Sequence, residues 1–205
     1  MEYKLKYPVI TISREYCAFG RTVAAALAEK LGIKYYDKDF IYKTVIESGF
    51  PEDVVKEESE AMSSASKFLE DMLGVTASYS SSFDKIFEAQ RGVILKLAEE
   101  GPCILVGRCA NVILRDAGIE SFNIYLHADI DIRKKRCAEI KPEMKDKNLE
   151  KYIKKIDNDR RIYFRRYAGS EVDDPRNYNI CLDVGRAGID KTVETILSLV
   201  AETCE

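Results

Sequence analysis

The amino-acid sequence predicts an α/β fold of the doubly wound type, in which helices cover both faces of a parallel sheet. Three observations support this prediction. Short apolar segments alternate with helical patterns, unusual polar residues and glycines follow several of these segments directly, and 205 residues with 46% hydrophobic side chains suffice for one substantial core. Ligands of such folds bind beyond the carboxyl ends of the strands. The residues that follow the apolar segments are therefore the first candidates for a functional site.

Five strands and the helices between them can be placed in order along the chain. The strands are expected at residues 9–12, 33–36, 103–106, 122–126 and 178–182. The first is a largely β-branched run, and the alanine-rich stretch that follows its turn is a strong helix former. Helices are expected at 23–28, at 38–49, from 83 to about 97, up to 116, after Asp129, at 149–167 and from 189 onward.

The segment between the second and third strands has a different composition. Residues 52–82 are acidic and serine-rich with weak periodicity, which favours helices joined by a loose link in an inserted lobe. The serine-rich part, residues 63–82, is either a flexible part of that lobe or a poorly packed helical hairpin. Apolar residues then recur at steps of three and four, which predicts an amphipathic helix. They are Phe83, Ile86, Phe87, Ile94 and Leu97.

Composition and charge exclude several classes of partner. The chain has 32 Lys and Arg against 35 Asp and Glu, so no global positive field attracts nucleic acid or an anionic membrane. No stretch approaches the roughly 20 apolar residues of a membrane span, and the first residues lack the apolar core of a signal peptide. The six cysteines show neither zinc spacing nor a CxxC pair, as expected of thiols in a reduced cytosol. We therefore expect a cytoplasmic protein without nucleic-acid or membrane partners.

The turn after the first strand is similar to a phosphate-binding loop, which needs glycines, a cation and a hydroxyl for Mg²⁺. Against the pattern G-x-x-x-x-G-K-[ST], Gly20 and Thr22 match. Arg21 replaces the lysine, and Glu15 replaces the first glycine. The alternative is an ordinary strand-to-helix turn with Arg21 in solvent. The placement between a strand and a helix favours the phosphate loop, in which Arg21 would bind phosphate bidentately and Thr22 would bind Mg²⁺.

The helix expected at 149–167 has an apolar stripe that an arginine interrupts. Arg160 lies where the spacing calls for an apolar residue, and Asp157, one turn earlier, can hold its guanidinium through an ion pair. Arg165 adds charge nearby. One interpretation is an arginine whose stem packs over an apolar seam while its charge reaches water. The other is a lid whose Arg160 binds a transferred phosphoryl group, because such transfer depends on positioning and charge neutralisation.

Two further candidates follow strands. Arg108 comes after Gly107, which lacks a side chain that would block a ligand. We expect Arg108 to contact a substrate phosphate, with a salt bridge, for example to Asp116, as the alternative. Asp37 ends the second strand and is equally well explained as a helix cap or as a contact to substrate. The single histidine, His127, follows a buried strand, where a structural role is commoner than a catalytic one.

Several stretches of the sequence, in order and with consistent spacing, are similar to those of a known family. They are ITISREYCAFGRTVAAALAEKLGIKYYDKDFI, ILVGRCANVIL, YLHADIDIRKKR and a tail with DNDRRIYFRRYAG and DPRNYNICLD. On these motifs the chain resembles the cytidylate-kinase-like family. The resemblance implies a P-loop NTPase three-layer sandwich whose five-stranded parallel sheet has the strand order 2-3-1-4-5. It also implies a single domain over residues 1–205, with a helical acceptor-binding insertion at 38–100 and a lid region at 141–176.

The resemblance further implies Mg²⁺-dependent transfer of a phosphoryl group from ATP to a nucleoside monophosphate, CMP-like, or to a similar small acceptor. The donor nucleotide would lie on Ser13, Arg14, Cys17, Ala18, Phe19, Gly20, Arg21 and Thr22. The acceptor would be bound by Asp37, Arg108 and Asp157. Catalysis would use Arg21, Arg160 and Arg165. The alternatives are a nucleotide-binding regulatory module without turnover and a kinase for a non-nucleotide metabolite.

Some positions depart from the family's usual motifs. Residues 17–19 stand where the family's loop is usually glycine-rich. Lys38 and Asp39 stand in place of the rest of the DSG or DTG motif of true cytidylate kinases, and Cys109 stands in place of an aspartate. Because the DSG and GRD motifs belong to enzymes that act on CMP, the sequence leaves the acceptor open.

Overall fold

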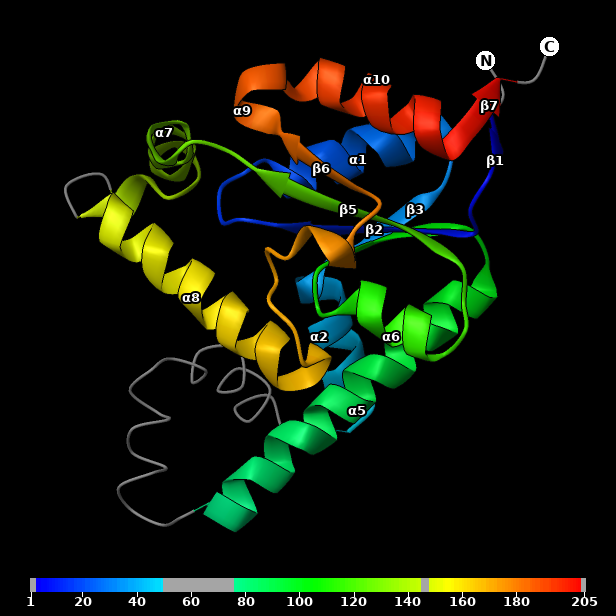
Figure 1. Ribbon diagram of the computed structural model, residues 1–205. Coiled ribbons are helices and arrows are strands. Elements are labelled where there is room, and N and C mark those ends of the chain that lie inside the picture. The colour runs from blue at the N-terminus through cyan, green and yellow to red at the C-terminus, as the bar shows by residue number, and fades with distance from the viewer. Residues whose placement is uncertain (1–2, 50–75, 145–147, 204–205) are drawn as a thin grey trace.

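Helices cover both faces of a parallel sheet in the computed structural model, which describes residues 3–49, 76–144 and 148–203 (Figure 1). The strands of this sheet are β2 (Val9–Arg14), β3 (Lys34–Tyr36), β4 (Cys103–Val106), β5 (Ser121–His127) and β6 (Ile180–Asp183). They lie in the order β3-β4-β2-β5-β6, and each neighbouring pair is parallel. Numbered along the chain within this sheet, the order is 2-3-1-4-5. The predicted fold class is therefore confirmed.

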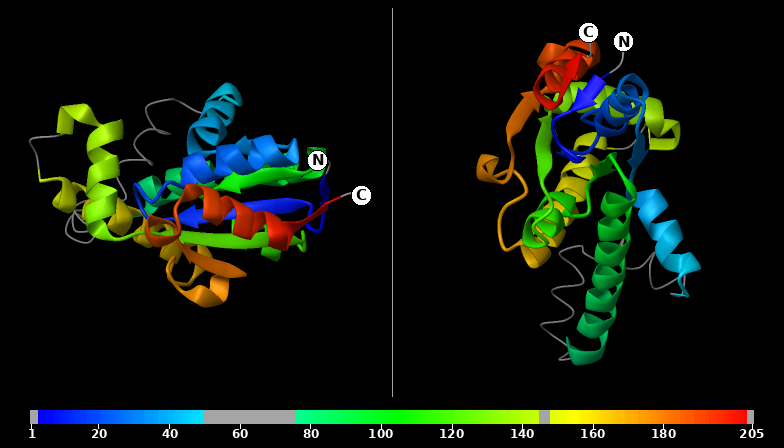
Figure 2. Two further views of the ribbon diagram at one scale, coloured as in Figure 1. Left: turned by 90° about the horizontal axis from the view of Figure 1, so that it is seen from above. Right: turned by 90° about the vertical axis from the view of Figure 1, so that its right-hand side faces the viewer.

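Two cores lie on the two faces of the sheet. Ile10 and Ile12 of β2 pack with α1 (Gly20–Leu31) and α10 (Ile189–Val200). Val9 faces the opposite way and packs with α5 (Thr76–Glu100) and α6 (Ala110–Asp116). In Figure 1, α1 and α10 lie above the sheet and α5 and α6 below it, and the right-hand view of Figure 2 shows the same separation. Burial on both faces explains why the strands read as continuous apolar runs.

Helix ends follow local signals in the sequence. The other helices are α2 (Lys38–Glu47), α7 (Ile130–Ile140), α8 (Leu149–Ala168) and α9 (Val184–Ala187), with 3-10 turns at Pro142–Met144 and Pro175–Asn177. Asp37 and Asp129 each accept backbone hydrogen bonds from the first turn of the helix that follows, α2 and α7 respectively. α8 ends at Gly169, whose φ of 64° is a conformation that glycine adopts without strain.

The chain ends form a second, two-stranded sheet that the sequence did not predict. β1 (Tyr3–Leu5) pairs antiparallel with β7 (Ala201–Thr203), and the N–H of Lys6 donates to the carbonyl of Val200 (2.8 Å). β1 and β7, from opposite ends of the chain, accordingly lie side by side (Figure 1). The pairing of these two strands joins opposite ends of the chain, so local sequence gives no sign of it.

Part of the predicted insertion lies outside the described residues. The structure does not describe residues 50–75. The expectation for the serine-rich stretch 63–82 therefore stays a prediction. The last residues of this stretch belong to α5, which begins at Thr76. The predicted amphipathic helix is confirmed, because α5 contains all of its apolar positions and buries four of the five. Across the described ranges, no helix is long and apolar enough to cross a membrane.

Candidate functional site

Neighbouring strands bring the candidate residues to one edge of the sheet. β2 and β3 each pair in parallel register with β4, which lies between them. Arg14 ends β2, Asp37 follows β3 and Arg108 follows shortly after β4. All three therefore lie at the carboxyl edge of the sheet, where ligands of this fold class bind. α8 joins them there through the contacts described below.

Arg14 crosses this edge from the end of β2 to the turn after β4. A Cβ on Gly20 would lie 2.8 Å from Arg14 Cγ, and a Cβ on Gly107 would collide with the Arg14 guanidinium. A side chain at either glycine would therefore displace the arginine. Arg14 is half-buried. Burial, together with the charges of neighbouring arginines, lowers the pKa of Arg14 well below its ordinary value.

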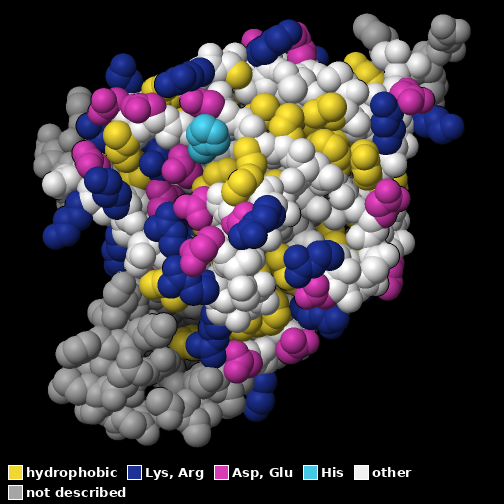
Figure 3. All heavy atoms as spheres, in the orientation of Figure 1, with side chains coloured by type: hydrophobic (Ala, Val, Ile, Leu, Met, Phe, Trp, Pro, Cys, Tyr) yellow, Lys and Arg dark blue, Asp and Glu magenta, His cyan; other side chains and the backbone are white. Residues whose placement is uncertain are grey.

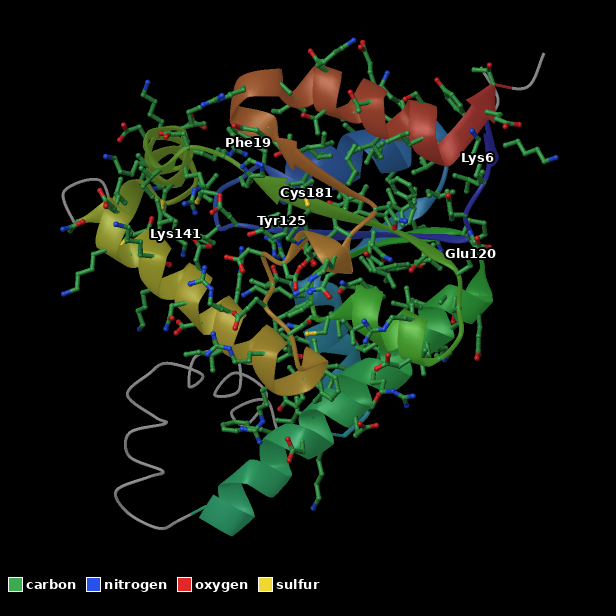
Figure 4. All side chains as sticks on the ribbon, viewed as in Figure 1. Lys6, Phe19, Glu120, Tyr125, Lys141 and Cys181 are labelled. Atoms are coloured by element: carbon green, nitrogen blue, oxygen red, sulfur yellow. The ribbon has the colours of Figure 1, made fainter. Side chains whose placement is uncertain are left out.

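The loop between β2 and α1 has backbone conformations that usually belong to glycine, although larger residues occupy these positions. Cys17 and Phe19 have φ values of 63° and 58°, in the left-handed region that favours glycine. Cys17 is buried beside Cys137, and burial raises its pKa to about 12, which keeps the thiol protonated at neutral pH. Phe19, labelled in Figure 4, packs against the core on the α1 face. It directly precedes α1, whose first turn has neither a side-chain cap nor an acidic residue, an arrangement that suits an anion.

A network with Asp157 at its centre holds α8 and α7 to the loop. Asp157 Oδ1 accepts from the N–H of Tyr16 (2.6 Å), and Oδ2 accepts from Arg133 Nη1 (2.5 Å). Arg133 is buried, and its Nε lies 3.4 Å from Glu15 Oε2. Charge-assisted bonds of this kind are shorter and stronger than neutral ones. The contacts of Asp157 are thus with the protein's own backbone and with α7.

Arg160 takes a different partner from the one that the sequence suggests. The sequence predicts an ion pair with Asp157, but Arg160 Nη1 donates to the carbonyl oxygen of Arg14 (3.1 Å), and its guanidinium lies 5.2 Å from the ring centroid of Tyr16. The prediction was wrong because the two carboxylate oxygens of Asp157 accept from the N–H of Tyr16 and from Arg133 instead. Burial lowers the pKa of Arg160, and the charge of Asp157 opposes that shift.

Arg108 lies between two aromatic rings that come from different helices. Its guanidinium is 4.4 Å from the ring centroid of Tyr42 in α2 and 4.7 Å from that of Tyr163 in α8. The hydroxyl of Tyr163 donates to Gln90 in α5 (2.9 Å), and both residues are buried. Asp116, the named alternative partner, pairs with Arg115 (3.0 Å). The two rings fix the position of the Arg108 cation at the edge of the sheet.

Lys38, the first residue of α2, joins these arginines. It is half-buried, and its pKa is lowered by burial and by the charges of Arg108, Arg160 and Arg14, with Asp39 acting in the opposite direction. We call Arg14, Lys38, Arg108 and Arg160 the cation cluster. Arg160 donates to the backbone of Arg14, and the Arg14 guanidinium lies against Gly107, next to Arg108. Like charges in these half-buried, neighbouring positions repel one another, so an anion bound among them would relieve the repulsion.

Arg21 and Asp37 contact each other. Arg21 Nε lies 2.8 Å from Asp37 Oδ2, and Nη2 also pairs with Asp39. Asp37 at the same time caps α2, so the helix-cap explanation is confirmed. Two residues that the resemblance assigns to donor and acceptor separately therefore join the start of α1 to the start of α2.

Comparison with known proteins identifies the family. The sequence profile of the cytidylate kinase-like family matches residues 9–186. The chain belongs to this family. It is 26% identical to a cytidylate kinase from Methanococcus vannielii over 168 residues, which are 82% of this chain and 84% of that protein.

Solved structures show the same fold as this cytidylate-kinase-like chain. An uncharacterized protein from Eubacterium ventriosum has a TM-score of 0.70 and 25% identity, over 94% of this chain and 97% of that one. A shikimate kinase from Acinetobacter baumannii has a TM-score of 0.55 and 15% identity, over 95% and 93% of the two chains. The second likeness is one of fold alone.

The remaining predicted loop residues of this cytidylate-kinase-like protein lie around the start of α1. Ser13 and Ala18 are buried, Gly20 begins the helix, and Thr22 is half-buried in its first turn. The described residues contain no group of three or more His, Cys, Asp or Glu side chains that could hold a metal ion. A single hydroxyl at Thr22 suits Mg²⁺, which keeps several waters and takes other ligands from phosphates.

Arg165 lies on a different side of α8 from Arg160. The two are separated by five residues, which is about 140° around a helix. Arg165 is exposed, and its Nη2 lies 2.6 Å from Glu171 Oε1. Its catalytic role remains a prediction, and no contact of the described residues brings it to the cation cluster.

Sequence reasoning missed two residues of this site, Arg133 and Lys38. Arg133 lies in a run of four basic residues that look alike in sequence, and only its burial distinguishes it. Lys38 follows Asp37 directly, and its position just after a strand of the sheet is the signal that could have identified it.

Proposed function

We propose that this cytidylate-kinase-like protein transfers the γ-phosphoryl group of ATP to a nucleoside monophosphate, CMP-like, or to a similar small acceptor. The observation that carries this proposal is the cation cluster, four basic side chains held together beside the uncapped start of α1. Phosphoryl transfer depends mainly on positioning and on neutralising negative charge, and both features serve that chemistry.

The residues divide into donor and acceptor roles in this proposal. The N–H groups at the start of α1 would hold donor phosphates, and Thr22 would ligate the Mg²⁺ that accompanies them. Mg²⁺ would neutralise charge on the donor phosphates. Arg108, fixed by its two tyrosines, would bind the phosphate of the acceptor, and Arg160 would neutralise charge at the transferred group. A phosphate acceptor is already an anionic nucleophile, so no general base is required.

One observation favours a second candidate function, a nucleotide-binding module without turnover. Arg21 stands where a standard phosphate loop has its lysine, yet two carboxylates of the α2 start hold it. If these ion pairs persist when nucleotide binds, the usual phosphate-loop cation does not reach the γ-phosphate, and transfer then depends wholly on the cation cluster.

A coupled ADP-release assay tests both candidates. Purified protein would be given ATP and Mg²⁺ with CMP, dCMP, UMP, AMP and, separately, non-nucleotide metabolites that carry a hydroxyl or a phosphate. ADP release that depends on one acceptor, and that Arg160→Ala abolishes, would support a kinase and name its substrate class. Binding of ATP without release for any acceptor would favour the module, whereas release only with a non-nucleotide acceptor would replace the nucleoside monophosphate by that compound.

A further inference from the structure

We infer that Arg14, rather than Arg21, takes the place of the phosphate-loop lysine and contacts the transferred phosphoryl group alongside Arg160, and that Arg21 is a positioning residue that ties α2 to the phosphate loop. This inference rests on the proposed function, because it assumes that ATP binds at the start of α1. It goes beyond that function by giving the role of the missing phosphate-loop lysine to a residue at the end of the first core strand.

The path of the Arg14 side chain is the first argument. The stem passes over Gly20, where α1 begins, and the guanidinium lies against Gly107, one residue before Arg108. The Arg14 guanidinium therefore lies between the start of α1, the proposed donor site, and Arg108, the proposed acceptor contact. A phosphoryl group in transfer must pass through the space between donor and acceptor.

The charges around Arg14 are the second argument. In the described part of the chain, no hydrogen bond or ion pair joins its guanidinium to a carboxylate, and the neighbouring charges of Arg160, Arg108 and Arg21 are all positive. Among the described residues, Asp37 supplies an opposing charge, and Asp37 is paired with Arg21. A half-buried guanidinium in such surroundings is stabilised when an anion binds to it, and its planar fork suits phosphate oxygens.

The state of Arg21 is the third argument. Its guanidinium contacts both Asp37 and Asp39, and its side chain is 51% exposed to solvent. Contact with a phosphate would require it to give up at least one of these carboxylates. Because Asp37 also caps α2, the ion pair fixes the start of α2, and with it Lys38, relative to the loop.

The chemistry of the step is balanced without proton transfer from either arginine. The bond between the γ-phosphorus and the β–γ bridging oxygen breaks, and its electron pair stays on that oxygen in ADP. An oxygen of the acceptor phosphate forms the new bond to phosphorus. Arg14 would donate hydrogen bonds to the non-bridging oxygens of the group in transit, where charge is distributed in the transition state.

Equilibrium binding separates the two arginines without requiring turnover. Calorimetry with Mg²⁺ present would compare ADP with β,γ-imido-ATP, which differ by the γ-phosphate. We expect Arg14→Met, which keeps the stem over Gly20 but removes the charge, to lose at least ten-fold in affinity for β,γ-imido-ATP and to leave the affinity for ADP within two-fold. Arg21→Met should keep the preference for β,γ-imido-ATP. Arg115→Met, which removes an exposed arginine paired with Asp116, is the matched control and should behave as wild type.

Arg14→Lys provides a second test that retains a positive charge. We expect it to recover part of the preference for β,γ-imido-ATP and less of the rate of ADP release, because a lysine lacks the bidentate fork. The inference is overturned if Arg14→Met keeps the preference, if Arg21→Met is the variant that loses it, or if wild-type protein shows no preference at all.

The same measurements distinguish this inference from the proposed function. Loss of the γ-phosphate preference in Arg14→Met, together with no ADP release for any acceptor, would support the role of Arg14 and refute the kinase. Acceptor-dependent ADP release with an unchanged preference in Arg14→Met would support the kinase and refute the role of Arg14. Failure of wild-type protein to bind either nucleotide would overturn both.

Discussion

The arginines of α8 fall into two groups that differ in what they contact. Those of the outer group each pair with a carboxylate: Arg161 with Asp173, Arg165 with Glu171 and Arg166 with Asp84. Arg160 points instead to the loop after β2, where it donates to a backbone carbonyl and lies near Arg14, Lys38 and Arg108. Figure 3 shows acidic and basic side chains interleaved on the side of the molecule where α7 and α8 lie.

Under the proposed function, this difference separates arginines that stabilise the structure from an arginine that would bind phosphate. Exposed ion pairs contribute about 0.2–1 kcal/mol each and attach the segment after α8 to the helix. Cations that face one another lower the stability of the folded chain, and a bound anion compensates for that loss. The same residue type within one helical turn thus has opposite consequences for stability.

Arg160→Ala tests the comparison with the largest expected effect. We expect acceptor-dependent ADP release to fall about 1000-fold, because an arginine that neutralises transition-state charge contributes at least that much in related chemistry. The free energy of unfolding should change by less than about 1 kcal/mol. Arg161→Ala is the matched control and should keep a near wild-type rate. Steady-state kinetics and urea unfolding provide the two measurements, and equal rate losses in both variants would contradict the division into two groups.

Gly107→Ala tests whether the position of Arg14 matters. The new Cβ would collide with the Arg14 guanidinium at a φ of 84°. We expect a loss of about 3 kcal/mol in unfolding free energy, of which about 1–2 kcal/mol is backbone strain, and a large loss of ADP release. Gly118→Ala is the control, since its φ of 71° brings similar strain but a Cβ there meets no atom within 4 Å. It should lose stability by the strain alone and keep its activity. Identical behaviour of the two variants would refute a positioning role for the Gly107 turn.

Asp157→Asn tests the attachment of α8 to the loop. Removing the charge weakens the bond to buried Arg133, and hydrogen bonds to charged groups contribute about 1.5–3 kcal/mol, so we expect a loss of about 2 kcal/mol. Asp173→Asn, at an exposed pair, should cost less than about 0.5 kcal/mol. Urea unfolding measures both values, and similar losses would show that the buried network is no stronger than a surface pair.

Lys38→Met has the smallest expected effect. Unlike the variants above, it should stabilise the folded protein. Because the folded state lowers the pKa of Lys38, the charged form is disfavoured in the fold, and wild-type protein loses stability at every pH below that lowered pKa. The variant should be more stable than wild type by up to about 1 kcal/mol at pH 7. The difference should shrink as the pH rises from the lowered pKa toward the ordinary pKa of lysine, about 10.4.

Thermal unfolding at pH 7 and pH 10 measures this difference for Lys38→Met. Lys43→Met, which removes an exposed lysine of α2 paired with Glu47, is the control and should not stabilise the protein. Destabilisation by Lys38→Met at pH 7 would mean that Lys38 stabilises the folded protein rather than opposing its neighbours.

The sequence alone determined the five strands of the parallel sheet, most helices and the edge of the sheet where the candidate site lies. These features follow from local properties of the sequence. Strands buried on both faces are continuous apolar runs, such as 103–106. Asp37 caps the start of α2 and Gly169 ends α8, each through the backbone next to it. Arg108 could be predicted for the same reason, because a residue after a parallel strand lies at the carboxyl edge.

Only the tertiary structure decided which charges meet. The register of β2, β3 and β4 brings Arg14 and Lys38 to the same edge of the sheet. The packing of α8 on the loop places Asp157 in contact with Arg133 rather than with Arg160. The short sheet between β1 and β7 likewise joins residues from opposite ends of the chain. Sequence spacing constrains neighbours within one helix or strand, whereas the energy of a charge depends on every group that packing places within a few ångströms.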